Sequence, residues 1–190
     1  MARCVILLAG EFGRPPAELL PKKGDLVIAC DGGLLHARRL GLAPDLLLGD
    51  FDSLPEPIPE GLPVLRFPVH KDDTDAMLAA REGLDRGFTD FLLLFGLGGR
   101  LDHTLANIQT LSFLQSRGAE GELWGPDSRL CLMRGPQTRR FEALPGMSFS
   151  VFAWDGPAGG VTLEGFGYGT DRADLTGDYP LGVSNSLEAG

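Results

Sequence analysis

Residues 26–33 read LVIACDGG, an apolar run of five residues that ends in an aspartate and two glycines. Apolar runs of this length are typical of strands that are buried on both faces of a parallel sheet. The pattern recurs where Leu46–Leu48 leads into Gly49-Asp50-Phe51-Asp52-Ser53, and where Val64–Val69 leads into Lys71-Asp72-Asp73-Thr74-Asp75. The sequence therefore predicts three strands that each end in a cluster of carboxylates.

Helical segments alternate with these strands. Two further runs, Val5–Ala9 and Phe91–Phe95, have strand composition, whereas Leu54–Pro63 contains four prolines and predicts an irregular loop. Three segments have helical character and each is followed by a glycine: Leu34–Leu40, Thr74–Arg86 and, approximately, His103–Arg117. This alternation predicts an α/β fold with an open, mostly parallel sheet flanked by helices, whose ligands lie beyond the carboxyl ends of the strands.

The pattern changes after Gly118. Short strand-like runs then follow one another without helical spacing, separated by Gly, Pro and Asp: Glu122–Trp124, Leu130–Met133, Phe149–Trp154 and Val161–Leu163. This region is typical of an antiparallel β-sandwich. We therefore expect an α/β domain over residues 1–122 and a β-sandwich domain over residues 123–190.

The composition restricts the class of protein. A hydrophobic content of 43% with 23% charged residues is ordinary for a globular chain, so disorder is not expected. The net charge of −9 argues against a nucleic-acid partner, because phosphate backbones are bound by clustered Lys and Arg. No apolar run approaches the ~20 residues that span a bilayer. We expect neither a nucleic-acid nor a membrane partner.

The cysteines and the N-terminus indicate the compartment. Cys4, Cys30 and Cys131 are odd in number, widely spaced and set in apolar stretches, as expected for buried thiols in a reducing environment. The first residues lead straight into a strand and lack a signal-peptide cleavage pattern. We expect a cytoplasmic protein.

The acidic clusters suggest a magnesium site for phosphate chemistry. Mg²⁺ takes oxygen ligands and shares them with substrate phosphates. Asp50 and Asp52 are two residues apart, so in extended geometry both carboxylates leave the same face. A turn with Asx hydrogen bonds would explain this pair equally well. In the next cluster Thr74 has the position of a helix N-cap, which is compatible with metal ligation by Asp75. Lys71 either meets a phosphate or offsets Asp72 and Asp73.

A glycine-rich loop provides a second phosphate-binding element. Gly96-Leu97-Gly98-Gly99-Arg100 follows the predicted strand Phe91–Phe95 and precedes a helix, whose N-terminus offers free N–H groups. The loop matches neither the phosphate-loop pattern nor the dinucleotide fingerprint. A tight turn without function has the same composition, but Arg100 and Asp102 beside the loop favour a phosphate site. The histidines and cysteines lack the spacing of a zinc site.

Six motifs occur in this order along the chain: Asp31-Gly32-Gly33; Pro44-Asp45 with Gly49-Asp50-Phe51-Asp52-Ser53; Lys71-Asp72-Asp73-Thr74-Asp75; Gly98-Gly99-Arg100-Leu101-Asp102-His103 with Ala106-Asn107; Gly160-Val161-Thr162 with Gly165 and Tyr168; and Ser184-Asn185. In this combination they resemble the motifs of thiamine pyrophosphokinases over nearly the whole chain. The resemblance implies transfer of the diphosphoryl group of ATP to the hydroxyl of thiamine, giving thiamine diphosphate and AMP. It also implies a homodimer whose active site is shared between the subunits.

The resemblance also implies roles for individual residues. Asp50, Asp52 and Asp75 are expected to bind Mg²⁺, with Asp31 near the nucleotide phosphates. The expected ATP-binding positions are Thr74, Gly98, Gly99, Arg100 and Asp102, and the expected thiamine-binding positions are Ser184 and Asn185. The catalytic set is then Asp31, Asp50, Asp52, Asp75 and Arg100.

Two other functions fit part of the pattern. A Mg²⁺-dependent phosphohydrolase would use water in place of thiamine and release phosphate from ATP without it. A non-catalytic nucleotide-binding relative would be expected to lose acidic ligands, yet Asp50, Asp52 and Asp75 are all present. The diphosphotransferase is therefore the preferred hypothesis.

Overall fold

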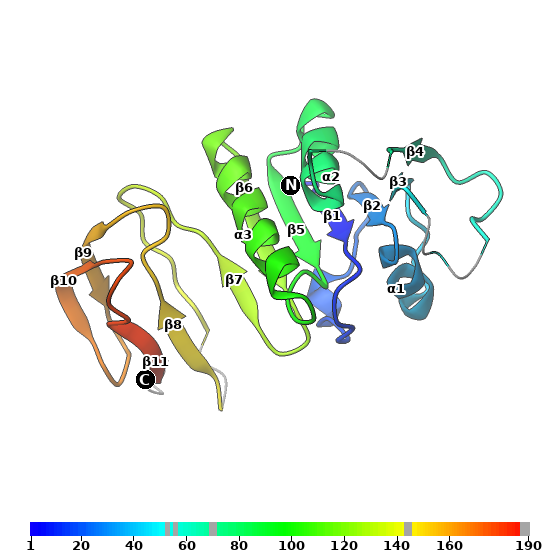
Figure 1. Ribbon diagram of the computed structural model, residues 1–190. Helices are drawn as coiled ribbons and strands as arrows, with labels where there is room; N and C mark the ends of the chain where they lie inside the picture. Colours follow the sequence, from blue (N-terminus) through cyan, green and yellow to red (C-terminus); the bar gives the residue numbers. More distant parts are fainter. Residues whose placement is uncertain (52–53, 55–56, 69–71, 143–145, 187–190) are drawn as a thin grey trace. The chain divides into compact units, whose positions relative to one another are not determined.

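The computed structural model describes residues 1–51, 54, 57–68, 72–142 and 146–186 (Figure 1). Contacts within the chain divide it into two units, Met1–Gly135 and Pro136–Gly190. The expected boundary near residue 122 differs from this division. Each unit is described by itself.

The first unit is built on a seven-stranded sheet in the order β4-β3-β2-β1-β5-β6-β7. All neighbouring pairs are parallel except β6 and β7, and in the middle of the sheet Val5 pairs with Val27 on one side and Leu92 on the other. The strands are β1 (Cys4–Leu7), β2 (Leu26–Cys30), β3 (Leu46–Gly49), β4 (Val64–Arg66), β5 (Asp90–Leu94), β6 (Glu120–Trp124) and β7 (Arg129–Cys131). The strand order reverses between β1 and β5, and ligands bind at such switch points in open α/β sheets.

Three helices cover the two faces of this sheet. Helices α2 (Asp75–Asp85) and α3 (Leu101–Ser116) contact each other (Figure 1). They pack on one face of the sheet through buried side chains such as Ala79 and Leu111. Helix α1 (Gly33–Leu40) packs on the other face through Ala37. The chain also contains a short 3-10 helix, η1 (Ala17–Leu19). The α/β class predicted from the alternating signals is confirmed.

The local sequence signals located the helices well. The C-cap of α1 is Gly41 in left-handed geometry, and the N-cap of α2 is Thr74, whose hydroxyl accepts a hydrogen bond from the Met77 amide at 3.3 Å. Helix α3 begins at Leu101, slightly before the predicted start at His103. Among the helices of the described residues, none has both the length and the apolar character of a membrane span.

Two strand assignments were wrong. Glu122–Trp124 and Leu130–Met133 were expected in the second domain, but β6 and β7 extend the sheet of the first unit. Strand β6 follows α3 in the same parallel arrangement as the earlier strands, and its Leu123 is fully buried in the core. A short strand carries no local signal for the sheet that it joins, which explains the error.

The second unit contains antiparallel strand pairs, as predicted. Strands β9 (Ala158–Leu163) and β10 (Thr170–Leu175) form one pair, and β8 (Ser148–Val151) and β11 (Gly182–Ser186) form another. The rings of Phe141, Phe149 and Phe166 pack in series, with centroid distances of 5.2 and 4.6 Å. Strands β10 and β11 escaped sequence prediction because most of their residues are polar.

Candidate functional site

Three predicted carboxylates meet at the carboxyl edge of the first unit's sheet. Asp31 follows β2, Asp50 follows β3, and Asp75 is the first residue of α2. Asp31 and Asp75 are joined by a side-chain hydrogen bond, and the charge of Asp50 also acts on Asp31. Asp52 lies outside the described residues. Parallel strands share one carboxyl edge, and this brings together residues that are distant in sequence.

Asp31 is the most constrained of the three. Its backbone has a φ of 44°, and its Oδ1 accepts a hydrogen bond from the Phe51 amide at 3.2 Å. Partial burial raises the pKa of Asp31 from 3.8 to about 7, and the hydrogen bond with Asp75 and the charges of Asp75 and Asp50 act in the same direction. Without a cation, Asp31 therefore binds a proton more tightly than an ordinary aspartate does.

The raised pKa of Asp31 predicts how stability depends on pH. Because the folded protein binds this proton more tightly than the unfolded chain, the stabilisation is present below about pH 4 and is lost as the pH rises through about 7. We expect the Tm of the metal-free protein to fall by a few degrees over this range, and the fall to be absent in Asp31→Asn. Calorimetric scans of both proteins in chelator measure it, and parallel curves would contradict the raised pKa of Asp31.

The donor set suits a hard cation. Asp31, Asp50 and Asp75 offer carboxylate oxygens of the kind that Mg²⁺ prefers, and the charges of Asp75 and Asp50 both raise the pKa of Asp31, as expected where carboxylates gather without a counter-charge. Among the described residues, which leave out Asp52, no group of three or more acidic, His or Cys side chains is placed so that it could hold a metal ion. A metal there would draw its remaining ligands from Asp52, water and substrate phosphates.

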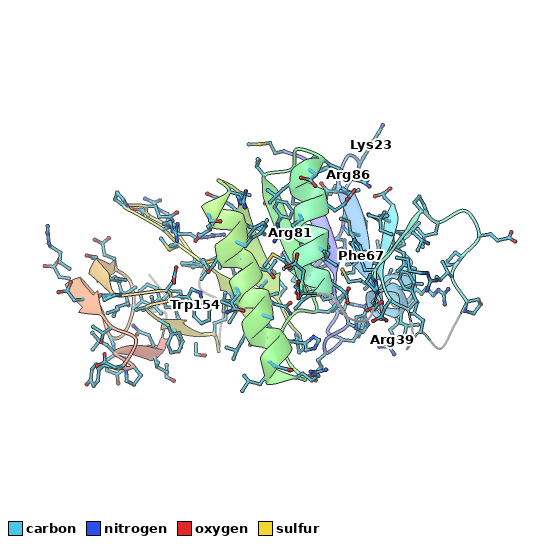
Figure 2. All side chains as sticks on the ribbon, turned by 45° about the horizontal axis from the view of Figure 1, so that its top comes forward. Lys23, Arg39, Phe67, Arg81, Arg86 and Trp154 are labelled. Carbon is cyan, nitrogen blue, oxygen red and sulfur yellow. The ribbon has the colours of Figure 1, made fainter. Side chains whose placement is uncertain are left out.

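Neighbouring side chains hold the segments that carry these carboxylates. The guanidinium of Arg66 donates to the backbone oxygen of Asp50 at 3.1 Å and lies over the Phe51 ring at 4.8 Å. In the cluster before α2, Asp73 forms an ion pair with Arg81 at 3.0 Å. Arg81 belongs to α2 (Figure 2), and its guanidinium lies over the Phe113 ring of α3 at 4.7 Å from the centroid. Asp73 thus has a cationic partner, while Lys71 lies outside the described residues.

The glycine-rich loop connects β5 to α3 as predicted. Gly98 and Gly99 have φ values of 84° and 70°, which glycine adopts readily. The buried amide of Asn107 donates to the Gly96 carbonyl at 2.8 Å and ties the loop to the helix. Arg100 is the N-cap residue of α3, and with the loop it brings backbone amides and a positive charge to the same edge as the carboxylates.

Arg100 and Asp102 form an exposed pair at the start of α3. Arg100 donates to the two carboxylate oxygens of Asp102 at 3.1 and 2.5 Å, and both side chains are more than three-fifths exposed. This interaction holds the pKa of Asp102 at about 2. The exposed guanidinium is accessible to a phosphate. Binding a phosphate would cost only the surface ion pair with Asp102, and such pairs contribute little free energy.

In the second unit, Ser184 and Asn185 lie on β11. Asn185 is buried, and its amide accepts from the Tyr168 backbone N–H at 2.9 Å and donates to the Tyr168 carbonyl at 2.7 Å. Ser184 has a φ of 59°, and its N–H donates to the Ser150 hydroxyl at 3.0 Å. Asn185 therefore holds the turn at Tyr168, and its contact with thiamine stays a prediction.

Sequence reasoning missed one buried polar residue beside the site. His36 of α1 is 7% exposed, and its Nε2 lies 2.9 Å from the carbonyl oxygen of Gly10, in the loop after β1. A histidine on the buried face of an amphipathic helix gives no local indication of its partner. The available signal was Gly10, a glycine shortly after β1.

Comparisons with known proteins identify the family of this chain. The sequence model described as thiamin pyrophosphokinase, catalytic domain, matches residues 17–120, more than half of the chain. The thiamine pyrophosphokinase of Bacillus subtilis (strain 168) is 30% identical over 170 residues, covering 85% of this chain and 78% of that protein.

Solved structures extend the likeness to the whole chain. The crystal structure of thiamine pyrophosphokinase from Bacillus subtilis matches with a TM-score of 0.80 and 26% identity, covering 99% of this chain and 91% of that one. A thiamin pyrophosphokinase family protein from Enterococcus faecalis shares the fold with a TM-score of 0.69 at 22% identity, covering 98% and 90%. By its sequence match over the unit that carries the acidic edge and by its fold, the chain belongs to the thiamin pyrophosphokinase family.

Proposed function

We propose that this protein is a thiamine pyrophosphokinase, which transfers the diphosphoryl group of ATP to the hydroxyl of thiamine and releases AMP. The observation that carries the proposal is the meeting of Asp31, Asp50 and Asp75 at one sheet edge, in a unit that matches the family's catalytic domain. The glycine-rich loop and Arg100 at the start of α3 supply the complementary phosphate-binding groups.

Asp50, Asp52 and Asp75 would hold Mg²⁺, with Asp31 beside them. Bound there, the cation would neutralise charge on the phosphates of ATP and align them. The chain's own groups act on the same atoms. Amides of the Gly96–Gly99 loop and the Arg100 guanidinium would bind phosphate oxygens, and Arg100 would offset the charge that grows on the α–β bridging oxygen as AMP leaves. Positioning of the thiamine hydroxyl in line with the β-phosphorus would provide much of the rate.

The proposal is tested by incubating the protein with ATP, Mg²⁺ and thiamine and separating the products by chromatography. We expect AMP and thiamine diphosphate in equal amounts, and no AMP when thiamine is left out. Release of inorganic phosphate without thiamine would instead identify a phosphohydrolase. Absence of any product would identify a non-catalytic relative.

We further propose that the working unit is a homodimer in which each active site takes groups from both subunits. Large apolar side chains of the second unit are exposed, among them Phe152 at 63%, Tyr168 at 76% and Tyr179 at 66%. Aromatic side chains are enriched at surfaces that bind a partner. In this arrangement the turn at Tyr168 and Ser184 would serve the ATP site of the other subunit.

Subunit mixing tests the shared site. We expect Asp50→Asn and the double variant Tyr168→Ala, Ser184→Ala to be inactive alone and to regain activity together. At equal amounts about half of the dimers are mixed, and each has one complete site of two, so activity should reach about a quarter of the wild-type value. Asn185 is unsuitable for this test because its amide holds the turn. No recovery despite proven subunit exchange, or a monomer in light scattering, would contradict the proposal.

A cytoplasmic location also remains our proposal. Cys4 and Cys30 are buried in the core of the first unit, where thiols act as small apolar side chains. Burial raises the pKa of the Cys4 thiol to about 12, which keeps it protonated and unreactive. Such cysteines suit a reducing compartment.

A further inference from the structure

Two loops meet where the strand order of the sheet reverses. One loop follows β1 and begins near Gly10, and the other is the glycine-rich loop after β5. The Gly10 amide donates to the Phe95 carbonyl at 3.0 Å, and a Cβ added at Gly10 would lie only 2.2 Å from that oxygen. A Cβ added at Gly98 would lie 2.8 Å from Oε2 of Glu11. The two loops are therefore in direct contact, and a shift in the first must move the second.

The glycine-rich loop starts from a strained residue. Phe95 has a φ of 63°, a left-handed conformation that bulky residues rarely adopt and that persists only when the surroundings enforce it. Its ring is stacked on Phe12 with a centroid distance of 5.5 Å and an interplanar angle of 18°. Its carbonyl is held by the Gly10 amide. The loop after β1 thus supplies both restraints on Phe95.

His36 in turn restrains the loop after β1. Its ring contacts Phe12 and Phe95, with centroid distances of 5.3 and 4.6 Å. A carbonyl can only accept, so Nε2 must donate to the Gly10 oxygen at 2.9 Å. The other ring nitrogen, Nδ1, is buried and has no hydrogen-bond partner in the part of the chain that the structure describes. Burial and the nearby charge of Arg39 both lower the pKa of His36, which favours the neutral ring with its proton on Nε2.

We propose that His36 is a positioning residue for the phosphate-binding loop. The connection runs from His36 to Gly10, from Gly10 to Phe95, and from Phe95 into Gly96–Gly99 and Arg100. Through it, the imidazole on one face of the sheet sets the conformation of the loop at the carboxyl edge. The inference rests on the proposed function, because the loop is assigned to the phosphates of ATP.

A buried histidine that only fills space would behave differently. Its replacement by a ring of similar size would leave the loops unchanged, or would weaken the whole core around it. A positioning role predicts a local effect on the two loops and on ATP, because only the hydrogen bond to Gly10 is lost. The conservative variant that keeps a donor near the Nε2 position should restore the native behaviour.

The test compares His36→Phe, which keeps the ring but removes the donor, with His36→Gln, whose amide can donate from a similar position. Thr110→Val is the matched control, since Thr110 is fully buried and its hydroxyl donates to the Ala106 carbonyl within α3. The readouts are hydrogen exchange at the Gly10 and Gly96 amides, calorimetric binding of a non-hydrolysable ATP analogue with Mg²⁺, and the KM for thiamine.

We expect His36→Phe to speed exchange at both amides and to weaken binding of the analogue, each by about tenfold, with the KM for thiamine unchanged. His36→Gln should stay within about threefold of wild type, and Thr110→Val should match wild type at these sites. Native loop exchange and native analogue affinity in His36→Phe would overturn the proposal. Equally increased exchange throughout β1 and β5 would also overturn it, in favour of a core role.

The experiment also distinguishes a variant that fails to fold from a failure of the proposed function. If His36→Phe does not fold, His36→Gln decides alone: native loops and native analogue binding support the inference, and their loss despite the retained donor overturns it. If the wild-type protein makes no thiamine diphosphate, the proposed function fails. The exchange comparison still reports whether His36 holds the two loops.

Discussion

Replacing Asp50 or Asp75 by Asn is expected to lower kcat by about 10²-fold or more without unfolding the protein. Each substitution removes one negative charge from the edge where the carboxylates gather, and a lost metal ligand costs several kcal/mol of transition-state stabilisation. The same result is expected for Asp52→Asn. The fold should survive, because Arg66 holds the Asp50 segment through its backbone oxygen and Thr74 caps α2 through its own hydroxyl.

The matched control is Asp85→Asn at the far end of α2, which removes the same charge from an exposed position outside the site. Steady-state rates at several Mg²⁺ concentrations separate the loss of a metal ligand from the loss of a surface charge. The site variants should need more Mg²⁺ and remain slow at saturation, whereas the control should follow wild type. Near-normal rates in both Asp50→Asn and Asp75→Asn would remove the basis of the metal assignment.

The acidic edge could be predicted from sequence because its signals are local. An apolar run followed directly by a carboxylate identifies both the strand and its end, as for Asp31 after β2 and Asp50 after β3. Because the strands are parallel, they all end at the same edge of the sheet, and their carboxylates lie near one another there. The three side chains therefore meet although their spacing in sequence reveals no contact.

Features that depend on pairing across the fold were not predictable in this way. Strand β6 joins the first sheet because α3 returns it alongside β5, which no short apolar run can indicate. The amide of Asn185 forms hydrogen bonds with the Tyr168 backbone, whereas the sequence predicts only a ligand-binding role for Ser184-Asn185. Similarly, the contacts of His36 with the Gly10 carbonyl and the Phe95 ring depend on the fold and could not be predicted from its position in the sequence.

Gly49→Ala is expected to reduce activity by about 10²-fold although no charged group is changed. Gly49 ends β3 with a φ of 151°, and a Cβ at this position would lie 1.8 Å from Oδ1 of Asp31. The carboxylate is the free end of a side chain, so it would move rather than the strand. Asp31 would then lose the hydrogen bond from Phe51 and its place beside Asp75.

Gly61→Ala separates this effect from backbone strain, because Gly61 also has a positive φ, 79°, but nothing lies within 4 Å of an added Cβ. It should lose some stability and keep its activity. The decisive measurement is a double-mutant cycle on kcat with Asp31→Ala. If the added methyl acts by displacing the Asp31 carboxylate, Gly49→Ala should cost little more once that carboxylate is gone, so the two effects should be far from additive. Additive losses would mean that Gly49 supports the site through its backbone alone, and the close approach of Gly49 to Asp31 would then have no part in catalysis.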